Sequence, residues 1–142
     1  MNKRQKSCGI IPYTIINNEI YYLLVKQTNG VICFPKGHVE ENETEEETAL
    51  RECLEETNVN VSLIPGYREE IEYYMEEYDA WKTLVYFVGK INNFDFVKQD
   101  SEISDIKLCK YDEAYELQYD NSKELVRKAD MFIKEKEFNI KK

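Results

Sequence analysis

Three glutamates, Glu52, Glu55 and Glu56, fall within five residues of the segment LRECLEETN, residues 50–58. On an α-helix these side chains lie within a sector of about 100°. Carboxylate oxygens without histidine or thiolate ligands select a hard cation such as Mg²⁺ or Mn²⁺. Mg²⁺ bound in this way commonly contacts substrate phosphates and helps to generate a hydroxide nucleophile. The segment therefore suits the hydrolysis of a phosphoanhydride.

The same glutamates are also compatible with a solvated helix face in an acidic protein. Like charges three or four residues apart oppose helix formation by only about 0.2–0.5 kcal/mol each, which an exposed surface tolerates. The segment by itself therefore leaves both interpretations open.

The residues around these glutamates predict a helix with defined ends. Thr44 and Glu47 have the spacing of a capping box, and Asn58 stands where a helix often ends in the left-handed conformation. The apolar stripe of this helix consists of Ala49, Leu50, Cys53 and Leu54. Packing the stripe on a sheet would turn all three glutamates together toward the opposite side.

The rest of the chain predicts an α/β fold, a mixed sheet with helices on both sides. Residues 20–26 and 83–88 are apolar on both faces, which is typical of strands covered on both sides. A turn at Asn17–Asn18 joins the first two strands, and Pro12 predicts an irregularity or an edge in the first. Strands are expected at 7–16, 20–26, 31–34, 59–64, 67–75, 82–91 and 103–109, and a second helix at about 122–136.

Length and charge limit the classes of partner. The 142 residues suit a single domain, which we expect to span residues 1–142. The net charge of -9 argues against duplex nucleic acid and membrane surfaces, which require a basic face. A small phosphorylated ligand stays compatible, because a few local cations or a metal ion can reverse the sign of the potential within one cleft.

The cysteines are scattered, with no C-x-x-C pair, and His38 is the only histidine, so the chain does not predict a zinc site. Such cysteines are typical of reduced thiols in a cytosolic protein. The N-terminus lacks the apolar run of a signal peptide, and no segment approaches the ~20 apolar residues of a membrane span. We expect a cytoplasmic protein without a membrane partner, and a monomer.

A longer motif begins at Gly37, where the sequence reads GHVEENETEEETALRECLEETNV. Its spacing resembles the Nudix box of the Nudix hydrolases, G-x5-E-x7-R-E-U-x-E-E-x-G-U, where U is a bulky aliphatic residue. Cys53 replaces one aliphatic residue and Asn58 replaces the second glycine, but asparagine is the next best residue at a left-handed cap. The fixed positions are occupied by Gly37, Glu43, Arg51, Glu52, Glu55 and Glu56.

This resemblance implies the α/β/α sandwich of the Nudix hydrolases, in which the box holds a divalent metal, Mg²⁺ or alternatively Mn²⁺. Glu55 or Glu56 would act as the base for the attacking water. Glu43 and Arg51 would pair and hold the loop against the helix, since a guanidinium matches a carboxylate geometrically. On this pattern the metal site would comprise Gly37, Glu52, Glu55 and Glu56.

Two further segments resemble the asymmetric diadenosine tetraphosphate hydrolases among these enzymes. FPKGHVE, residues 34–40, would place Lys36 and His38 on a polyphosphate chain, although a lone histidine is also often structural. In GYREEIEYYMEEYDAWKTLVYF, residues 66–87, Tyr73 would stack on a base and Lys82 would contact phosphate.

The remaining candidates lie later in the chain. Tyr119 resembles a second stacking aromatic, although with 11 tyrosines in the chain Tyr73 and Tyr119 are equally compatible with packing or surface positions. Glu102 stands where these hydrolases often place an acidic metal ligand. A plain loop acid is the alternative there, and Asp100 or Asp105 could take that place instead.

The leading hypothesis is a Mg²⁺-dependent enzyme that cleaves diadenosine tetraphosphate, a small nucleotide substrate, to ATP and AMP. An RNA 5′ pyrophosphohydrolase or a nucleoside triphosphate pyrophosphatase keeps the motif and changes the substrate. A non-catalytic nucleotide-sensing module is the alternative of another class, but a sensor could dispense with the complete R-E-x-x-E-E set.

Overall fold

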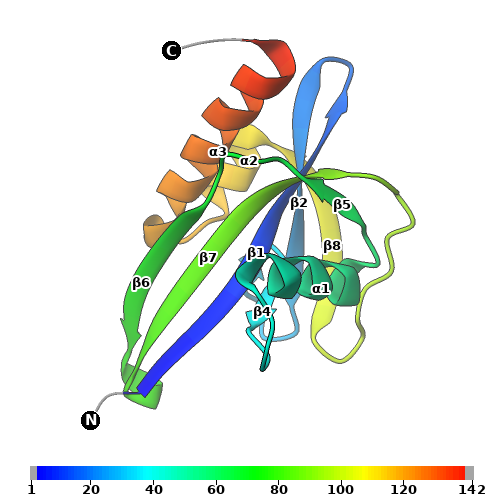
Figure 1. Ribbon diagram of the computed structural model, residues 1–142. Helices are drawn as coiled ribbons and strands as arrows, with labels where there is room; N and C mark the ends of the chain where they lie inside the picture. Colours follow the sequence, from blue (N-terminus) through cyan, green and yellow to red (C-terminus); the bar gives the residue numbers. More distant parts are fainter. Residues whose placement is uncertain (1–2, 140–142) are drawn as a thin grey trace.

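The computed structural model describes residues 3–139, so both ends of the expected domain, residues 1–2 and 140–142, lie outside the described residues. A mixed sheet lies between helices, as the sequence predicts (Figure 1). The strands are β1 (Lys3–Ile16), β2 (Glu19–Gln27), β3 (Ile32–Cys33), β4 (Lys36–His38), β5 (Val61–Leu63), β6 (Glu69–Met75), β7 (Ala80–Ile91) and β8 (Ile103–Lys110). The helices are α1 (Glu45–Thr57), the 3-10 turn η1 (Glu76–Tyr78), α2 (Tyr111–Glu116) and α3 (Asp120–Phe138).

Strands β1 and β7 form the centre of the sheet and run parallel, with Ser7 opposite Leu84. The other strand pairs within residues 3–139 are antiparallel. The sheet follows the order β3-β2-β1-β7-β5, and in addition β4 pairs with β1, β6 with β7 and β8 with β2. Asn17 and Asn18 adopt φ angles of 52° and 65°, which confirms the predicted tight turn between β1 and β2.

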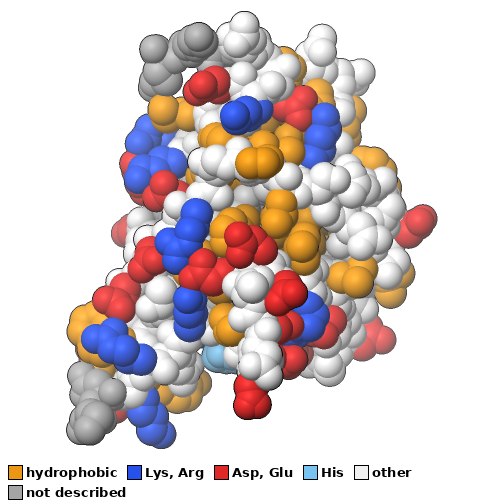
Figure 2. Space-filling model, viewed as in Figure 1, with side chains coloured by type: hydrophobic (Ala, Val, Ile, Leu, Met, Phe, Trp, Pro, Cys, Tyr) orange, Lys and Arg blue, Asp and Glu red, His pale blue; other side chains and the backbone are white. Residues whose placement is uncertain are grey.

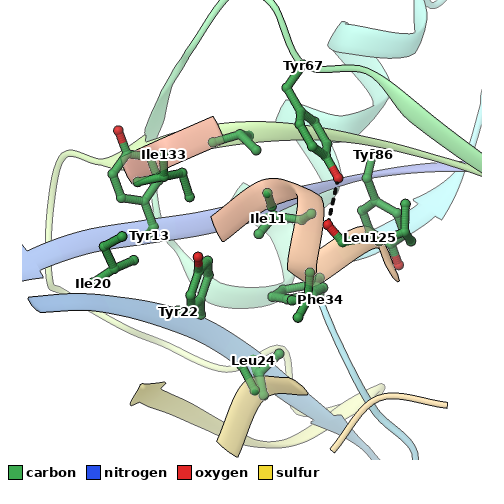
Figure 3. Packing of buried hydrophobic residues seen from close by; sticks show 14 of the residues in the cluster. Ile11, Tyr13, Ile20, Tyr22, Leu24, Phe34, Tyr67, Tyr86, Leu125 and Ile133 are labelled. Atoms are coloured by element: carbon green, nitrogen blue, oxygen red, sulfur yellow. Dashed lines mark hydrogen bonds between the residues drawn. The ribbon is translucent and has the colours of Figure 1, made fainter. Parts of the chain in front are cut away.

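Each face of the sheet carries its own hydrophobic core. On one face, Leu125 of α3 packs in a cluster with Tyr22, and the Tyr67 hydroxyl donates to the Leu125 carbonyl at 2.9 Å (Figure 3). On the other face, α1 contributes Ala49 and Cys53. Burial on both sides explains why β2 and the middle of β7 are apolar on both faces.

Helix α1 has the ends that its sequence predicts. Glu47 N donates to Thr44 Oγ1 at 3.1 Å while Thr44 N donates to Glu47 Oε1 at 2.8 Å, so the capping box is confirmed. Asn58 ends the helix with a φ of 63°, and its N–H donates to the Leu54 carbonyl at 2.8 Å. Local sequence therefore defines where the glutamate-bearing helix begins and ends.

The face on which α1 packs differs from the prediction. Leu54, expected in the apolar stripe, is 43% exposed, whereas Glu56, expected on the open side, is only 3% exposed. The segment after β7 covers this end of the helix, because Val97 N donates to the Thr57 carbonyl and Gln99 N to the Glu56 carbonyl. Apolar periodicity missed this cover, since the segment comes from a distant part of the chain. The buried residues of α1 are Thr48, Ala49, Cys53, Glu56 and Thr57.

Three elements were not predicted: β4, the 3-10 turn η1 and α2. Pro35 and Gly37 suggested a break, but residues 36–38 pair with residues 7–9 of β1 and form β4. Helix α2 has no side-chain cap and buries only Ala114, so its sequence shows neither a capping signal nor an apolar stripe. Pro12 lies between the stretches of β1 that pair with β4 and with β2, in agreement with the predicted irregularity. Within residues 3–139, no helix has the length and apolarity needed to span a membrane.

Candidate active site

The candidate site lies where α1 meets β4. A Cβ built on Gly37 would lie 2.0 Å from the Glu52 carboxyl carbon, so only glycine allows this close approach. Glu52 and Glu56, one turn apart on α1, line a cavity of about 440 Å³. Over the face that α1 covers, acidic and basic side chains lie close together (Figure 2). The same cavity is lined by Lys36, His38, Lys82 and Glu102.

Arg51 links the loop before α1 to the glutamates of the helix. Its Nε donates to Glu43 Oε2 at 2.6 Å and its Nη2 donates to Glu43 Oε1 at 3.1 Å. Its Nη1 donates to Glu52 Oε2 at 2.9 Å, and its Nη2 also donates to the His38 carbonyl at 3.0 Å. The hydrogen bond from Arg51 lowers the pKa of Glu43 to about 2. Arg51 therefore fixes the loop, β4 and Glu52 relative to one another.

Glu55 lies apart from the other two glutamates of the box. Its side chain is 45% exposed and accepts from Arg51 Nη1 at 3.2 Å, and it does not line the cavity. Within residues 3–139, no three histidine, cysteine, aspartate or glutamate side chains lie close enough together to hold one metal ion in their present conformations. The role of Glu55 as a metal ligand stays a prediction, and it requires the carboxylate to leave Arg51.

Glu56 has the properties of a carboxylate that is suited to bind a cation. Its Oε1 atom is buried and has no hydrogen-bond partner within the described residues. Burial first, and the nearby Glu52 carboxylate second, raise the pKa of Glu56 to about 8. A divalent cation would offset both effects, and the carboxylate set suits Mg²⁺ or Mn²⁺. In their donor chemistry, these carboxylates therefore fit the expected metal.

The raised pKa of Glu56 predicts a pH-dependent stability of the metal-free protein. Its proton contributes stability that is fully present below pH 4.5 and is lost as the pH rises through about 8. Glu56→Gln removes this dependence. In EDTA at pH 9, the free energy of unfolding of the variant should therefore exceed that of the parent by about 2–3 kcal/mol, which is less than the full shift because Glu52 shares part of it.

Urea unfolding of both proteins at pH 5 and pH 9 measures this difference. Comparing variant with parent cancels the contribution of the titrating groups that do not interact with Glu56. Equal destabilisation of the variant at both pH values would contradict the assignment.

Two lysines and the histidine supply the basic side of the cavity. Lys82 is buried, and its Nζ donates to Ser7 Oγ at 2.6 Å. Burial, and then the charge of Lys36, lower the pKa of Lys82 to about 8. Burial and the two lysines lower the pKa of His38, so at pH 7 it is a neutral hydrogen-bonding group. Within residues 3–139, neither lysine forms an ion pair.

A second cavity, of about 630 Å³, contains both predicted stacking aromatics. Tyr73 lies on β6. Tyr119 immediately precedes α3 and is 65% exposed. Lys36 and Lys82 line this cavity as well as the first one. The two cavities therefore adjoin. The two lysines at their junction form no ion pair within the described residues.

Of the three acids considered at residues 100–105, only Glu102 lines the carboxylate cavity. Asp100 is exposed and pairs with Lys98 at 2.7 Å, while Asp105 lines a different cavity. The Glu102 carbonyl accepts from Thr28 N at 2.9 Å, which ties this segment to the turn after β2. The structure thus brings Glu102 to the same cavity as Glu52 and Glu56.

Sequence reasoning missed several polar residues of the site. Gln27, the last residue of β2, and Asn29, in the turn that follows, line both cavities, and Ser7 of β1 lines the carboxylate cavity. The polar segment QTNG, residues 27–30, marks a turn, and this signal could have indicated a loop near the site. Nothing in the sequence around Ser7 distinguishes it from an ordinary strand serine.

Comparisons with known proteins agree with this geometry. The chain is 30% identical to a pig protein, Sus scrofa, named bis(5′-nucleosyl)-tetraphosphatase [asymmetrical], over 90% of this chain and 95% of the pig protein. The rat protein of the same name, from Rattus norvegicus, is 28% identical, with the same coverage. The crystal structure of a binary complex of a C. elegans Ap4A hydrolase superimposes with a TM-score of 0.83 at 27% identity, covering 91% of this chain and 97% of that one. This chain therefore has the α/β/α fold that its sequence motif implied.

The family model described as the NUDIX domain matches residues 7–129, which extend from within β1 into α3 and include every element between them. The match covers the box and also both cavities, with the lysines between them. The protein therefore belongs to the Nudix family.

Proposed function

We propose that this protein hydrolyses diadenosine tetraphosphate asymmetrically, to ATP and AMP, with Mg²⁺. The observation that carries this proposal is the pair of adjoining cavities, one with carboxylates and one with aromatics, with Lys36 and Lys82 lining both. The parts of a dinucleoside polyphosphate follow the same order: a base for the aromatic cavity, a phosphate chain for the two lysines, and the bond that is cleaved for the carboxylate cavity. The names of the pig and rat relatives support the same substrate class.

The aromatic cavity takes one nucleoside in this proposal. Tyr73 and Tyr119 stack on its base, a contact worth about 1–3 kcal/mol per base in nucleic-acid complexes. Lys36 and Lys82 then hold the phosphate chain, and their charge is free for it because neither lysine has a carboxylate partner within the described residues. His38, neutral at pH 7, contributes a hydrogen bond rather than a charge.

The carboxylate cavity takes the phosphate that is attacked. Glu52, Glu56 and Glu102, with the backbone at Gly37, would hold Mg²⁺, which when bound polarises a phosphoryl oxygen and lowers the pKa of the attacking water. Of the two candidates for the general base, Glu56 lines the cavity and Glu55 does not. We therefore assign to Glu56 the role of accepting a proton from the attacking water. Arg51, with Glu43, keeps Glu52 against Gly37.

Product analysis tests this function. Purified protein with Mg²⁺ is offered diadenosine tetraphosphate, triphosphorylated RNA and free nucleoside triphosphates side by side. ATP plus AMP as the preferred products is the expected result, whereas two molecules of ADP would contradict asymmetric cleavage. Preferred release of pyrophosphate from RNA or from a nucleoside triphosphate would reassign the substrate. Tight nucleotide binding without turnover would indicate a sensing module.

A further inference from the structure

Ser7 and Lys82 form a buried contact at the junction of the two cavities. They lie on the parallel central strands β1 and β7, and Lys82 Nζ donates to Ser7 Oγ at 2.6 Å. Ser7 is 1% exposed and Lys82 6% exposed. A buried ammonium is costly without a compensating partner, and the described residues offer this one no carboxylate. The hydroxyl is its only hydrogen-bond partner within residues 3–139.

A neutral partner has a specific advantage at this place. A carboxylate would orient Lys82 but would also neutralise its charge and compete with phosphate for it. The Ser7 oxygen holds one of the three ammonium hydrogens and leaves the positive charge and the other two hydrogens available. Because Lys82 lines both cavities, a fixed ammonium there can contact a phosphate chain that passes from one cavity to the other.

We propose that Ser7 is a positioning residue of the polyphosphate site, which acts by holding the Lys82 ammonium at the junction of the two cavities. The inference rests on the proposed function only in that a polyphosphate occupies this junction. It assigns a role to a strand residue that lies outside the Nudix box.

Binding of inorganic tripolyphosphate in the presence of Mg²⁺, measured by calorimetry, tests the proposal without any hydrolysis assay. Ser7→Ala should weaken the Kd about tenfold, as expected for loss of a hydrogen bond to a charged group. Ser7→Thr keeps a hydroxyl and should bind within about threefold of the parent. Ser62→Ala removes a serine hydroxyl that contacts Asn92 away from both cavities, and it should leave the Kd unchanged.

A double variant separates positioning from an independent or merely structural role. If Ser7 acts through Lys82, adding Ser7→Ala to Lys82→Met should cause no further loss of tripolyphosphate binding. With diadenosine tetraphosphate, Ser7→Ala should raise KM about tenfold and leave kcat within about threefold, because the contact exists before and during the reaction. Thermal melting of each variant verifies that it is folded.

Two results would overturn the inference: a Kd of folded Ser7→Ala within twofold of the parent, or a further tenfold loss in the double variant. If the protein fails to cleave diadenosine tetraphosphate but Ser7→Ala still weakens tripolyphosphate binding, the proposed function fails and this inference stands. If cleavage proceeds and tripolyphosphate binding is unchanged in Ser7→Ala, the inference fails alone.

Discussion

Glu56→Gln is expected to lower kcat/KM for diadenosine tetraphosphate at least about 100-fold, the usual cost of removing a positioned acid–base group. The Glu56 carboxylate is buried, lines the cavity, and has an oxygen without any hydrogen-bond partner in the described part of the chain. Glutamine has the same size, but it carries no charge for a cation and accepts no proton from water. Steady-state hydrolysis in saturating Mg²⁺ measures the loss.

Two other glutamates of α1 serve as controls for this prediction. Glu46→Gln removes an exposed carboxylate that lines neither of the two site cavities, and it should keep full activity. Glu55→Gln should cost less than Glu56→Gln, since Glu55 lies against Arg51 outside the cavity. A Glu56→Gln enzyme within tenfold of the parent, or a larger loss for Glu55→Gln, would contradict the assignment of the proton to Glu56.

Gly37→Ala is expected to produce a loss of similar size, about 100-fold, because a misplacement of about 1 Å at a reacting centre can cost that much. The added Cβ would lie 2.0–2.3 Å from the carbon and oxygens of the Glu52 carboxyl group. Both sides are held, Gly37 by the pairing of β4 with β1 and Glu52 by Arg51. The carboxylate must therefore leave its place, and both turnover and the affinity for Mg²⁺ should fall.

Gly30→Ala separates this steric effect from a general loss of backbone freedom. A Cβ at Gly30 meets no atom within 4 Å, but the φ of +93° makes alanine strained there. This variant should lose thermal stability and keep its activity, whereas Gly37→Ala should lose activity with a smaller change in melting temperature. Direct titration of Mn²⁺, followed by its electron paramagnetic resonance signal, reports metal binding independently of turnover. Unchanged Mn²⁺ affinity and turnover in Gly37→Ala would contradict the role given to this contact.

The features that depend on neighbouring residues could be predicted from the sequence. The capping box of Thr44 and Glu47 and the left-handed Asn58 follow from hydrogen bonds that join residues three or four positions apart. The turn at Asn17 and Asn18 is equally local. The spacing from Gly37 to Glu56 indicated the Nudix family, and the comparisons confirmed it. Hydrogen bonds between residues close in the sequence, and the spacing of a motif, do not depend on how distant segments pack.

Which of these residues share a cavity depends on contacts between distant segments of the chain. Glu56 is buried and Leu54 is exposed, and the distant residues Val97 and Gln99 donate hydrogen bonds to the last turn of α1, which no helical periodicity could reveal. Tyr73 and Tyr119 line the same cavity, and Ser7 contacts Lys82, which is 75 residues away in the sequence, because the parallel pairing of β1 with β7 and the packing of α3 bring distant segments together. Such contacts depend on the sum of many long-range packing energies, and a short motif contains only a small part of that sum.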